Sequence, residues 1–187
     1  MCGRYNLQGS WSDLVRLYRI VEDATPLNLR PRYNIAPPQD VVVVRKGPDG
    51  KGRDLSMMRW GLVPFWAKDL KVGARMINAV GEIAATKPAF MVAFRKRRCL
   101  VLANGFYEWK KESNRRLPTY FYPSSGEPMA FAGLWETWNS PEGQVIKSCT
   151  ILTTAANAMI EPLHNRMPVI LSDETQALWL DPLTEEP

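Results

Sequence analysis

Short apolar runs separated by turn signals recur along the whole chain, and this pattern predicts many strands and few helices. Most of the connections are short and rich in Gly, Pro, Ser and Asn, so antiparallel pairing is favoured. The predicted strands comprise residues 41–45, 98–103, 105–111, 119–123, 129–138, 145–156 and 167–172, together with a strand that runs into a proline-containing loop over 55–66. Residues 30–40, rich in Pro and Asn, are predicted to form a loop, and 47–50 a turn.

Helical spacing of apolar residues is limited to short stretches. The predicted helices cover residues 10–20, 81–88 and 173–180. Ser10 or Ser12 is placed to cap the first helix, and Ser172 or Asp173 the last. Pro88 is expected to end the middle one. The pattern predicts an α+β fold with a curled, mostly antiparallel, open barrel-like sheet and a few short helices.

Length and composition agree with one domain that spans residues 1–187. The chain is 45% hydrophobic and 23% charged, which is ordinary for a globular protein. Residues 22–40 are the only candidate linker and are too short to separate two domains. No apolar run is long enough to span a bilayer, and the start of the chain lacks a signal-peptide core. We therefore expect a cytoplasmic monomer without membrane contact.

Charge and cysteine content narrow the possible chemistry. A net charge of +5 favours a nucleic acid or another polyanion as partner. Three cysteines without CxxC spacing and a single histidine offer too few ligands for a zinc site, so no metal or other cofactor is expected. Cys99 and Cys149 lie inside apolar runs, and we interpret them as small core residues.

Cys2 is the strongest candidate for chemistry because it directly follows Met1. Methionine removal is usual before a small residue and would give an N-terminal cysteine. Its α-amine (pKa about 7.7–8.0) and thiol (about 8.5) would both be partly reactive near neutral pH. The amine condenses with an aldehyde to form an imine, and the neighbouring thiol closes a thiazolidine ring. The alternative is an incidental second residue.

Three further residues are candidates. His164, the only histidine, lies in a polar stretch before a strand, although a lone histidine is more often structural. Glu108 lies between Tyr107 and Trp109 on a predicted strand, where desolvation would favour general-acid behaviour; a solvated glutamate is the alternative. Asn78 either caps the following helix or holds a reacting group.

Arginines and aromatic residues supply possible nucleic-acid contacts. Trp60, in a strand, is expected in the core, whereas Trp66 follows Pro64 in a loop and is expected to be exposed. The arginines available for phosphate groups include Arg4, Arg30, Arg32, Arg75, Arg95, Arg97, Arg98 and Arg166.

An ordered set of segments carries a family resemblance over nearly the whole chain, from Met1 to about Trp179. The segments are MCGRY, RYNIAPPQ, MRWGLVPFWAKD, INAVGE, KPAF, RRCLVLANGFYEWKK, FAGLWETW, CTILTTAAN and LHNRMPVIL. In this order they resemble the SRAP family (SOS-response-associated peptidases), whose members include proteins that shield abasic sites in DNA.

The resemblance implies a covalent link from Cys2 to the opened sugar of an abasic site in single-stranded DNA. It further implies that Asn78 positions the α-amine and that Glu108 and His164 serve the acid–base steps. The positions expected by resemblance to line the DNA path are Arg4, Asn34, Pro37, Trp66, Arg98, Thr153 and Arg166.

This chain departs from the family pattern in three places. Val80 stands where an arginine usually contacts phosphate, so DNA affinity is expected to be lower or to be supplied by Arg75. Asn104 replaces an aspartate, which is a conservative change in a turn. Relatives continue past the Trp179 region, so either the chain is trimmed or the domain lacks an edge strand.

Two other functions remain open at this stage. Cys2 and His164 would form the nucleophile–base pair of a cysteine peptidase that acts on peptides or on its own Met1–Cys2 bond. A non-catalytic module for single-stranded DNA would use the same basic and aromatic residues, but would leave the position of Cys2 unexplained.

Overall fold

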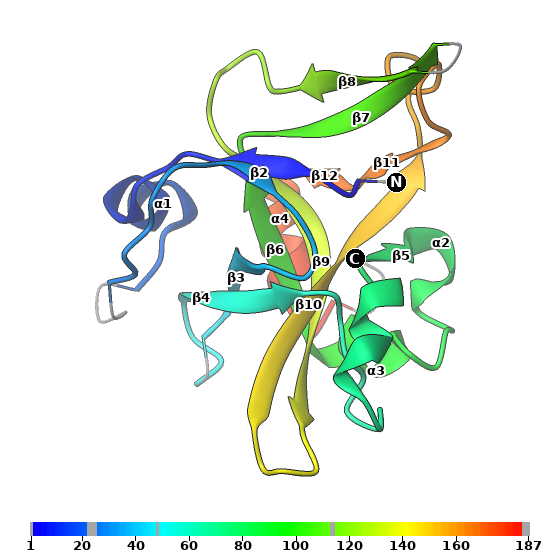
Figure 1. Cartoon of the computed structure of the whole chain (residues 1–187). Coiled ribbons are helices and arrows are strands. Elements are labelled where there is room, and N and C mark those ends of the chain that lie inside the picture. The colour runs from blue at the N-terminus through cyan, green and yellow to red at the C-terminus, as the bar shows by residue number, and fades with distance from the viewer. Residues whose placement is uncertain (1, 22–25, 48, 113–114, 185–187) are drawn as a thin grey trace.

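The computed structural model describes residues 2–21, 26–47, 49–112 and 115–184. Five of its strands form a closed hydrogen-bonded circuit (Figure 1). They follow the order β10-β4-β3-β6-β9, and β9 pairs again with β10. Their bounds are β3 (Asp40–Lys46), β4 (Arg53–Trp60), β6 (Arg98–Ala103), β9 (Met129–Asn139) and β10 (Val145–Ala155). The predicted barrel-like, mostly antiparallel sheet is confirmed. Predictions that involve Met1, residues 22–25, Pro48 and residues 185–187 lie outside this description.

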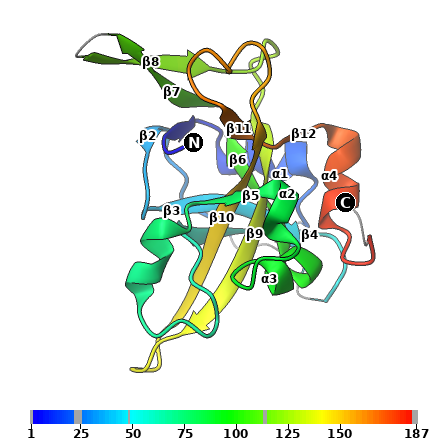
Figure 2. The same ribbon diagram turned by 90° about the vertical axis from the view of Figure 1, so that its right-hand side faces the viewer.

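A second, four-stranded antiparallel sheet lies across one end of this barrel, at the top of Figures 1 and 2. Its order is β2-β1-β7-β8, with β1 (Tyr5–Leu7), β2 (Arg32–Ile35), β7 (Gly105–Glu112) and β8 (Arg115–Phe121). β6 and β7 follow each other directly in the chain, so one continuous segment enters both sheets. The sequence pattern missed β1 and β2 because each is short and depends on a distant partner, β1 on β7 and β2 on β1.

Short strands extend β10 beyond the barrel. β5 (Asn78–Val80) pairs with it in parallel and β11 (Arg166–Pro168) antiparallel. The single strand predicted over 167–172 is divided, because β12 (Ile170–Leu171) pairs with β9 instead. Val169 marks the crossing point, since its N–H donates to Leu152 and its carbonyl accepts from Ala132.

The helices are short, and side-chain caps mark the start of only some of them. The structure contains α1 (Trp11–Tyr18), α2 (Gly81–Ala84), α3 (Met91–Lys96), α4 (Asp173–Leu180) and the 3₁₀ helix η1 (Leu70–Arg75). Ser10 and Asp13 form a reciprocal capping box at α1, and Ser172 caps α4. α2 ends well before Pro88, and α3, which has no side-chain cap, was not predicted. None of the helices in the described part of the chain is long and apolar enough to cross a membrane.

The core lies inside the barrel and beneath the second sheet. Trp60 is fully buried, its ring centre lies 5.1 Å from that of Tyr5, and its indole N–H donates to the carbonyl of Ile77 over 2.8 Å. Cys99 and Cys149 are also fully buried. The predicted core positions of these three residues are confirmed, and the Tyr5–Trp60 contact joins the start of the chain to the barrel.

The buried thiols predict a loss of stability in alkali. Burial raises the pKa of the Cys99 and Cys149 thiols above the ordinary value of 9.0. Because the folded state favours the protonated thiols more strongly than the unfolded state does, the thiols make their full contribution to the free energy of unfolding below about pH 9. That contribution is lost as the pH rises further. Under reducing conditions, the melting temperature followed by circular dichroism should fall from pH 8 to pH 11.

Cys149→Ala should flatten this pH dependence even though the smaller side chain lowers stability at pH 7. The exposed control Ser124→Ala should keep the wild-type dependence. An unchanged slope for Cys149→Ala would show that the thiol does not supply the effect.

Candidate active site

Asn78 connects Cys2 to the barrel. β5 runs parallel to β10 with Asn78 opposite Ile151, and the Asn78 side-chain N–H donates to the carbonyl oxygen of Cys2 over 2.9 Å. Asn78 does not cap α2. The N-cap residue of this helix is Val80, and no side-chain hydrogen bond caps the start of the helix. The resemblance assigned Asn78 to the α-amine of Cys2, whereas the observed bond is to its carbonyl. The other amide atom of Asn78, Oδ1, is buried and has no hydrogen-bond partner among the described residues.

The thiol of Cys2 is fully buried. Burial raises the pKa of this thiol well above its ordinary value, and the negative charge of Glu108 raises it further, while the backbone N–H of Arg4 acts in the opposite direction. The thiol therefore carries its proton at neutral pH. This differs from the partly ionised thiol expected for an exposed terminal cysteine.

Glu108 is only 3% exposed, as expected for a desolvated carboxyl group on β7. The pairing of β1 with β7 sets Tyr5 opposite Phe106, and the N–H of Tyr107 donates to the carbonyl of Arg4 over 2.9 Å. The start of the chain thus lies along β7. Glu108 is therefore close enough to Cys2 for its negative charge to raise the pKa of the thiol. Strand alternation directs Tyr107 and Trp109 to the opposite face of the sheet.

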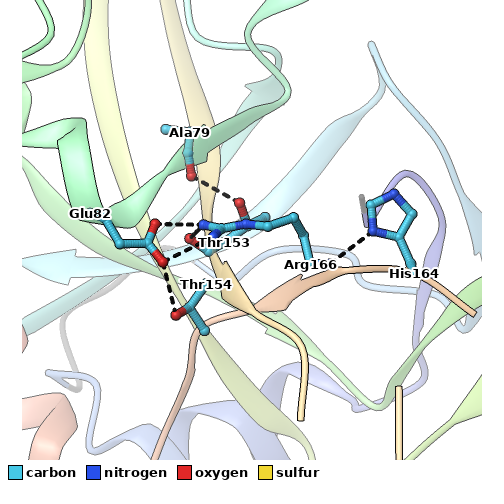
Figure 3. Close-up of polar contacts among 6 residues, drawn as sticks. All are labelled: Ala79, Glu82, Thr153, Thr154, His164 and Arg166. Atoms are coloured by element: carbon cyan, nitrogen blue, oxygen red, sulfur yellow. Dashed lines mark hydrogen bonds and ion pairs between the residues drawn. The ribbon is translucent and has the colours of Figure 1, made fainter. Parts of the chain in front are cut away.

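His164 lies in the loop between β10 and β11, and its ring orientation is set by the backbone. Its Nδ1 accepts a hydrogen bond of 2.9 Å from the backbone N–H of Arg166 (Figure 3). In the neutral ring the proton is therefore on Nε2, which makes this nitrogen a donor.

The guanidinium of Arg166 is held by two partners in Figure 3. It makes a bidentate pair with Glu82, over 2.9 Å and 2.6 Å, and donates to the carbonyl of Thr153. The hydrogen bonds from Arg166 lower the pKa of Glu82 to about 2. Thr153 is fully buried and its hydroxyl donates to Ala79, while Thr154 donates to Glu82. An arginine predicted to meet phosphate is thus already paired with a carboxylate.

Other residues predicted to line the DNA path lie at the surface. Arg4 donates to the side chain of Asn34 over 3.0 Å, and both line a groove of about 330 Å³ on the second sheet. Pro37 is half-buried and joined to Pro38 by a cis peptide bond. Trp66 is 52% exposed, which confirms its predicted exposure.

Arg98 lies apart from this group and packs against residues 179–184. It begins β6, whereas the other end of that strand leads into β7 and Glu108. Its guanidinium donates to the carbonyls of Asp181 and Thr184 and lies 5.5 Å from the ring centre of Trp179. The guanidinium is engaged by these two carbonyls, and Arg98 as a whole is only 5% exposed. The geometry therefore does not favour the predicted contact with DNA.

Six of the sequence-predicted residues therefore form two linked groups. Cys2, Asn78 and Glu108 meet at the start of the chain, and Thr153, His164 and Arg166 meet at β10 and β11. Two residues were missed. Glu82 pairs with Arg166, and the ring of Tyr5 places its buried hydroxyl within electrostatic reach of Cys2. Tyr5 belongs to the segment MCGRY and Glu82 to INAVGE. Neither segment indicates which distant residue lies beside its member. Across the described residues, no cluster of three or more His, Cys, Asp or Glu side chains could hold a metal ion.

The fold and the site together define a barrel-like α+β domain in which a buried cysteine lies beside an asparagine and a carboxyl group. The chain belongs to the SRAP family, since the family model described as "SOS response associated peptidase (SRAP)" matches residues 1–187.

Individual relatives agree with this membership. The chain is 40% identical over 188 residues to "Abasic site processing protein YoqW" of Bacillus subtilis (strain 168), covering 100% of this chain and 83% of that protein. It is 30% identical over 183 residues to "Abasic site processing protein YedK" of Escherichia coli (strain K12), covering 96% and 79%. An X-ray structure of a protein from Bacteroides thetaiotaomicron superposes with a TM-score of 0.90 at 22% identity, covering 99% and 83%, and so shares the fold.

Proposed function

We propose that this protein captures abasic sites in single-stranded DNA by forming a covalent adduct at Cys2. The relatives named as abasic site processing proteins support the substrate class. The observation that carries the proposal is the hydrogen bond from the Asn78 side chain to the carbonyl of Cys2, whose thiol lies near the buried carboxyl group of Glu108. All the residues required belong to one chain, so a monomer suffices, and no metal or organic cofactor takes part.

The chemistry requires the α-amine of Cys2, and therefore the removal of Met1. The amine attacks the aldehyde carbon of the opened sugar, and loss of water gives an imine. The thiol sulfur then adds to the imine carbon, while the thiol proton passes to the nitrogen. The sum is aldehyde, amine and thiol giving a thiazolidine and water. Because burial keeps the Cys2 thiol protonated, the thiol already carries the proton that passes to the nitrogen on ring closure.

Asn78 and Glu108 have complementary roles in this scheme. Asn78 holds the Cys2 carbonyl, and its buried Oδ1 is an acceptor that an α-amine could satisfy. Glu108 lies near the thiol and transfers the proton from sulfur to nitrogen. Together they orient the two reacting groups of one residue toward the same carbon atom.

His164 acts on the closed sugar. With Nδ1 occupied by the Arg166 N–H, the neutral ring presents Nε2–H as a donor to the ring oxygen of the abasic sugar. This hydrogen bond stabilises the ring oxygen as its bond to the anomeric carbon breaks, while the proton of the anomeric hydroxyl passes through water to that oxygen, which leaves the reactive aldehyde and a hydroxyl group. The role of His164 thus precedes that of Glu108.

The DNA path is proposed to include Arg4, Asn34, Pro37, Trp66 and Arg166, while Thr153, which is fully buried, acts only through the bond from Arg166 to its carbonyl. Trp66 offers an exposed ring for stacking on a base. Val80, which replaces the usual arginine, is 39% exposed and offers no charge, whereas Arg75 is exposed on η1. Arg98 is left out of this path because its guanidinium binds the chain end.

A cysteine peptidase fits the same geometry less well. Such an enzyme needs a thiolate activated by a neighbouring base. In this protein burial favours the protonated thiol of Cys2, and the Nδ1 atom of His164 is already occupied by a backbone N–H.

The assignment of the nucleophile is testable with the three cysteines. Wild-type protein should give a heat-stable shifted band on a denaturing gel with abasic single-stranded DNA and none with intact DNA. Cys2→Ala should abolish this band because it removes the thiol that closes the ring. Cys99→Ala and Cys149→Ala, measured below their melting temperatures, should retain it. Loss of the adduct in an internal variant that remains folded would exclude Cys2 as the sole nucleophile.

The division of roles predicts different responses to an open-chain aldehyde. His164→Ala should slow crosslinking to an ordinary abasic site by about 10²-fold or more, and an aldehyde that is already open should restore much of the rate. Glu108→Gln should be slow with both substrates. The exposed neighbour Asn165 provides a control, since Asn165→Ala should react like wild type. Equal rescue of His164→Ala and Glu108→Gln would overturn this division.

The pairing of Glu82 with Arg166 predicts a gain in DNA affinity on removal of the carboxylate. Glu82→Gln keeps the size, removes a negative charge from the proposed path and releases Arg166 toward phosphate. The Kd for undamaged single-stranded DNA should fall roughly two- to fivefold, as measured by fluorescence anisotropy at low salt. Weaker binding would instead show that Glu82 holds Arg166 in its DNA-binding orientation.

A further inference from the structure

The outer face of the four-stranded sheet carries an arrangement that the proposed chemistry does not use. Three successive cross-strand pairs of β7 and β8 share this face: Tyr107 with Tyr120, Trp109 with Pro118, and Lys111 with Arg116. We call these six residues the aromatic–basic strip. Glu108 is directed to the other face, where it is buried near Cys2.

The aromatic part of the strip is hollowed and open. Tyr107 and Trp109 line the groove of about 330 Å³ together with Tyr33, Arg4, Asn34 and Pro118. Tyr33 is 62% exposed, and the Tyr107 hydroxyl donates to its carbonyl over 3.1 Å. These rings therefore border an open groove instead of filling the core.

A row of tyrosines continues the aromatic surface. The ring centres of Tyr107 and Tyr120 lie 5.0 Å apart, and those of Tyr120 and Tyr122 lie 5.3 Å apart. The Tyr120 hydroxyl donates to the side chain of Asn6, and the Tyr120 ring lies so close to Gly105 that a Cβ there would meet it at 2.4 Å. The absence of a side chain at Gly105 thus lets this ring lie flat on the sheet.

The basic end of the strip is electrostatically unfavourable in the protein alone. Lys111 and Arg116 are both exposed and lie directly opposite each other. Like charges in this position destabilise a strand pair. On the other face of the same hairpin, Lys110 is paired with Glu112 over 2.6 Å. An anion bound between Lys111 and Arg116 would relieve their repulsion.

We infer that the aromatic–basic strip binds the part of the single-stranded DNA that flanks the captured nucleotide, by stacking bases in the groove and holding phosphate at Lys111 and Arg116. Aromatic rings beside a row of cations are the pattern that single-stranded nucleic acids require. Arg4 connects the strip to the nucleophile, because its side chain lines the groove while its backbone N–H contacts the Cys2 thiol. This inference rests on the proposed function and extends its DNA contacts from Arg4 and Asn34 along the outer face of β7 and β8.

The charges can be tested with two matched double variants. Lys111→Gln with Arg116→Gln removes two positive charges from the strip, and Lys110→Gln with Arg115→Gln removes two from the opposite face. Binding of an undamaged oligothymidine of about twenty nucleotides is measured by anisotropy at several salt concentrations. The strip variant should raise the Kd about fivefold or more and reduce the slope of log K against log salt by about 1.4. The opposite-face variant should change both clearly less.

The stacking component is tested with Tyr33→Ala, whose side chain is largely exposed and whose carbonyl remains available to Tyr107. It should weaken binding about fivefold or more without changing the salt slope. Equal behaviour of the two double variants, or wild-type affinity of Tyr33→Ala, would overturn the inference. So would equally tight binding of a polyglutamate peptide, because acidic protein would then be the ligand.

Crosslinking separates this inference from the proposed function. At saturating abasic DNA, the strip variant should form the adduct at the wild-type rate, since Lys111 and Arg116 do not contact the reacting atoms. If wild-type protein formed no adduct at all, the proposed function would fail. If the adduct formed while the affinities of the variants stayed equal, only the strip would be excluded.

Discussion

The hydrogen-bond pairing of β10 is the constraint on which both the barrel and the site depend. Along one edge this strand pairs with β9, which closes the barrel, and it also binds β4, β5 and β11. β5 brings Asn78 to Cys2, and β11 brings Arg166 to the carbonyl of Thr153. The same ladder therefore holds two segments that are almost ninety residues apart in the sequence. A shift of register by one residue would reverse the direction of every side chain in them.

Burial decides the protonation state of the Cys2 thiol, which is the proposed nucleophile. A terminal cysteine in water would be partly ionised, whereas here burial and the charge of Glu108 both favour the protonated thiol. A protonated thiol is a weak general nucleophile, but it suits addition to an imine on its own residue, where proximity compensates for low intrinsic reactivity. This environment is the reason that we propose reaction with an aldehyde in preference to reaction with a peptide bond.

The two faces of the four-stranded sheet separate the residues of the proposed chemistry from those inferred to bind DNA. Alternation along β7 directs Glu108 inward and Tyr107, Trp109 and Lys111 outward. The inner face is buried and holds the groups of the proposed chemistry, while the outer face is exposed and carries the residues inferred to bind DNA. Arg4 spans the two, and its side-chain bond to Asn34 keeps β1 and β2 in place beside β7.

Local pattern was sufficient for the strands of the barrel, the capped helices α1 and α4, and the core positions of Trp60, Cys99 and Cys149. Each of these depends on periodicity or on a capping residue that is read within a few positions. β1, β2 and β5 could not be predicted in this way, because strands of three or four residues exist only through partners distant in the chain. The ordered family motifs brought forward Cys2, Asn78, Glu108 and His164 as candidates. Only the tertiary structure decided that Arg98 binds the chain end and that Glu82 holds Arg166, because both are long-range contacts whose energy depends on burial and geometry rather than on residue type.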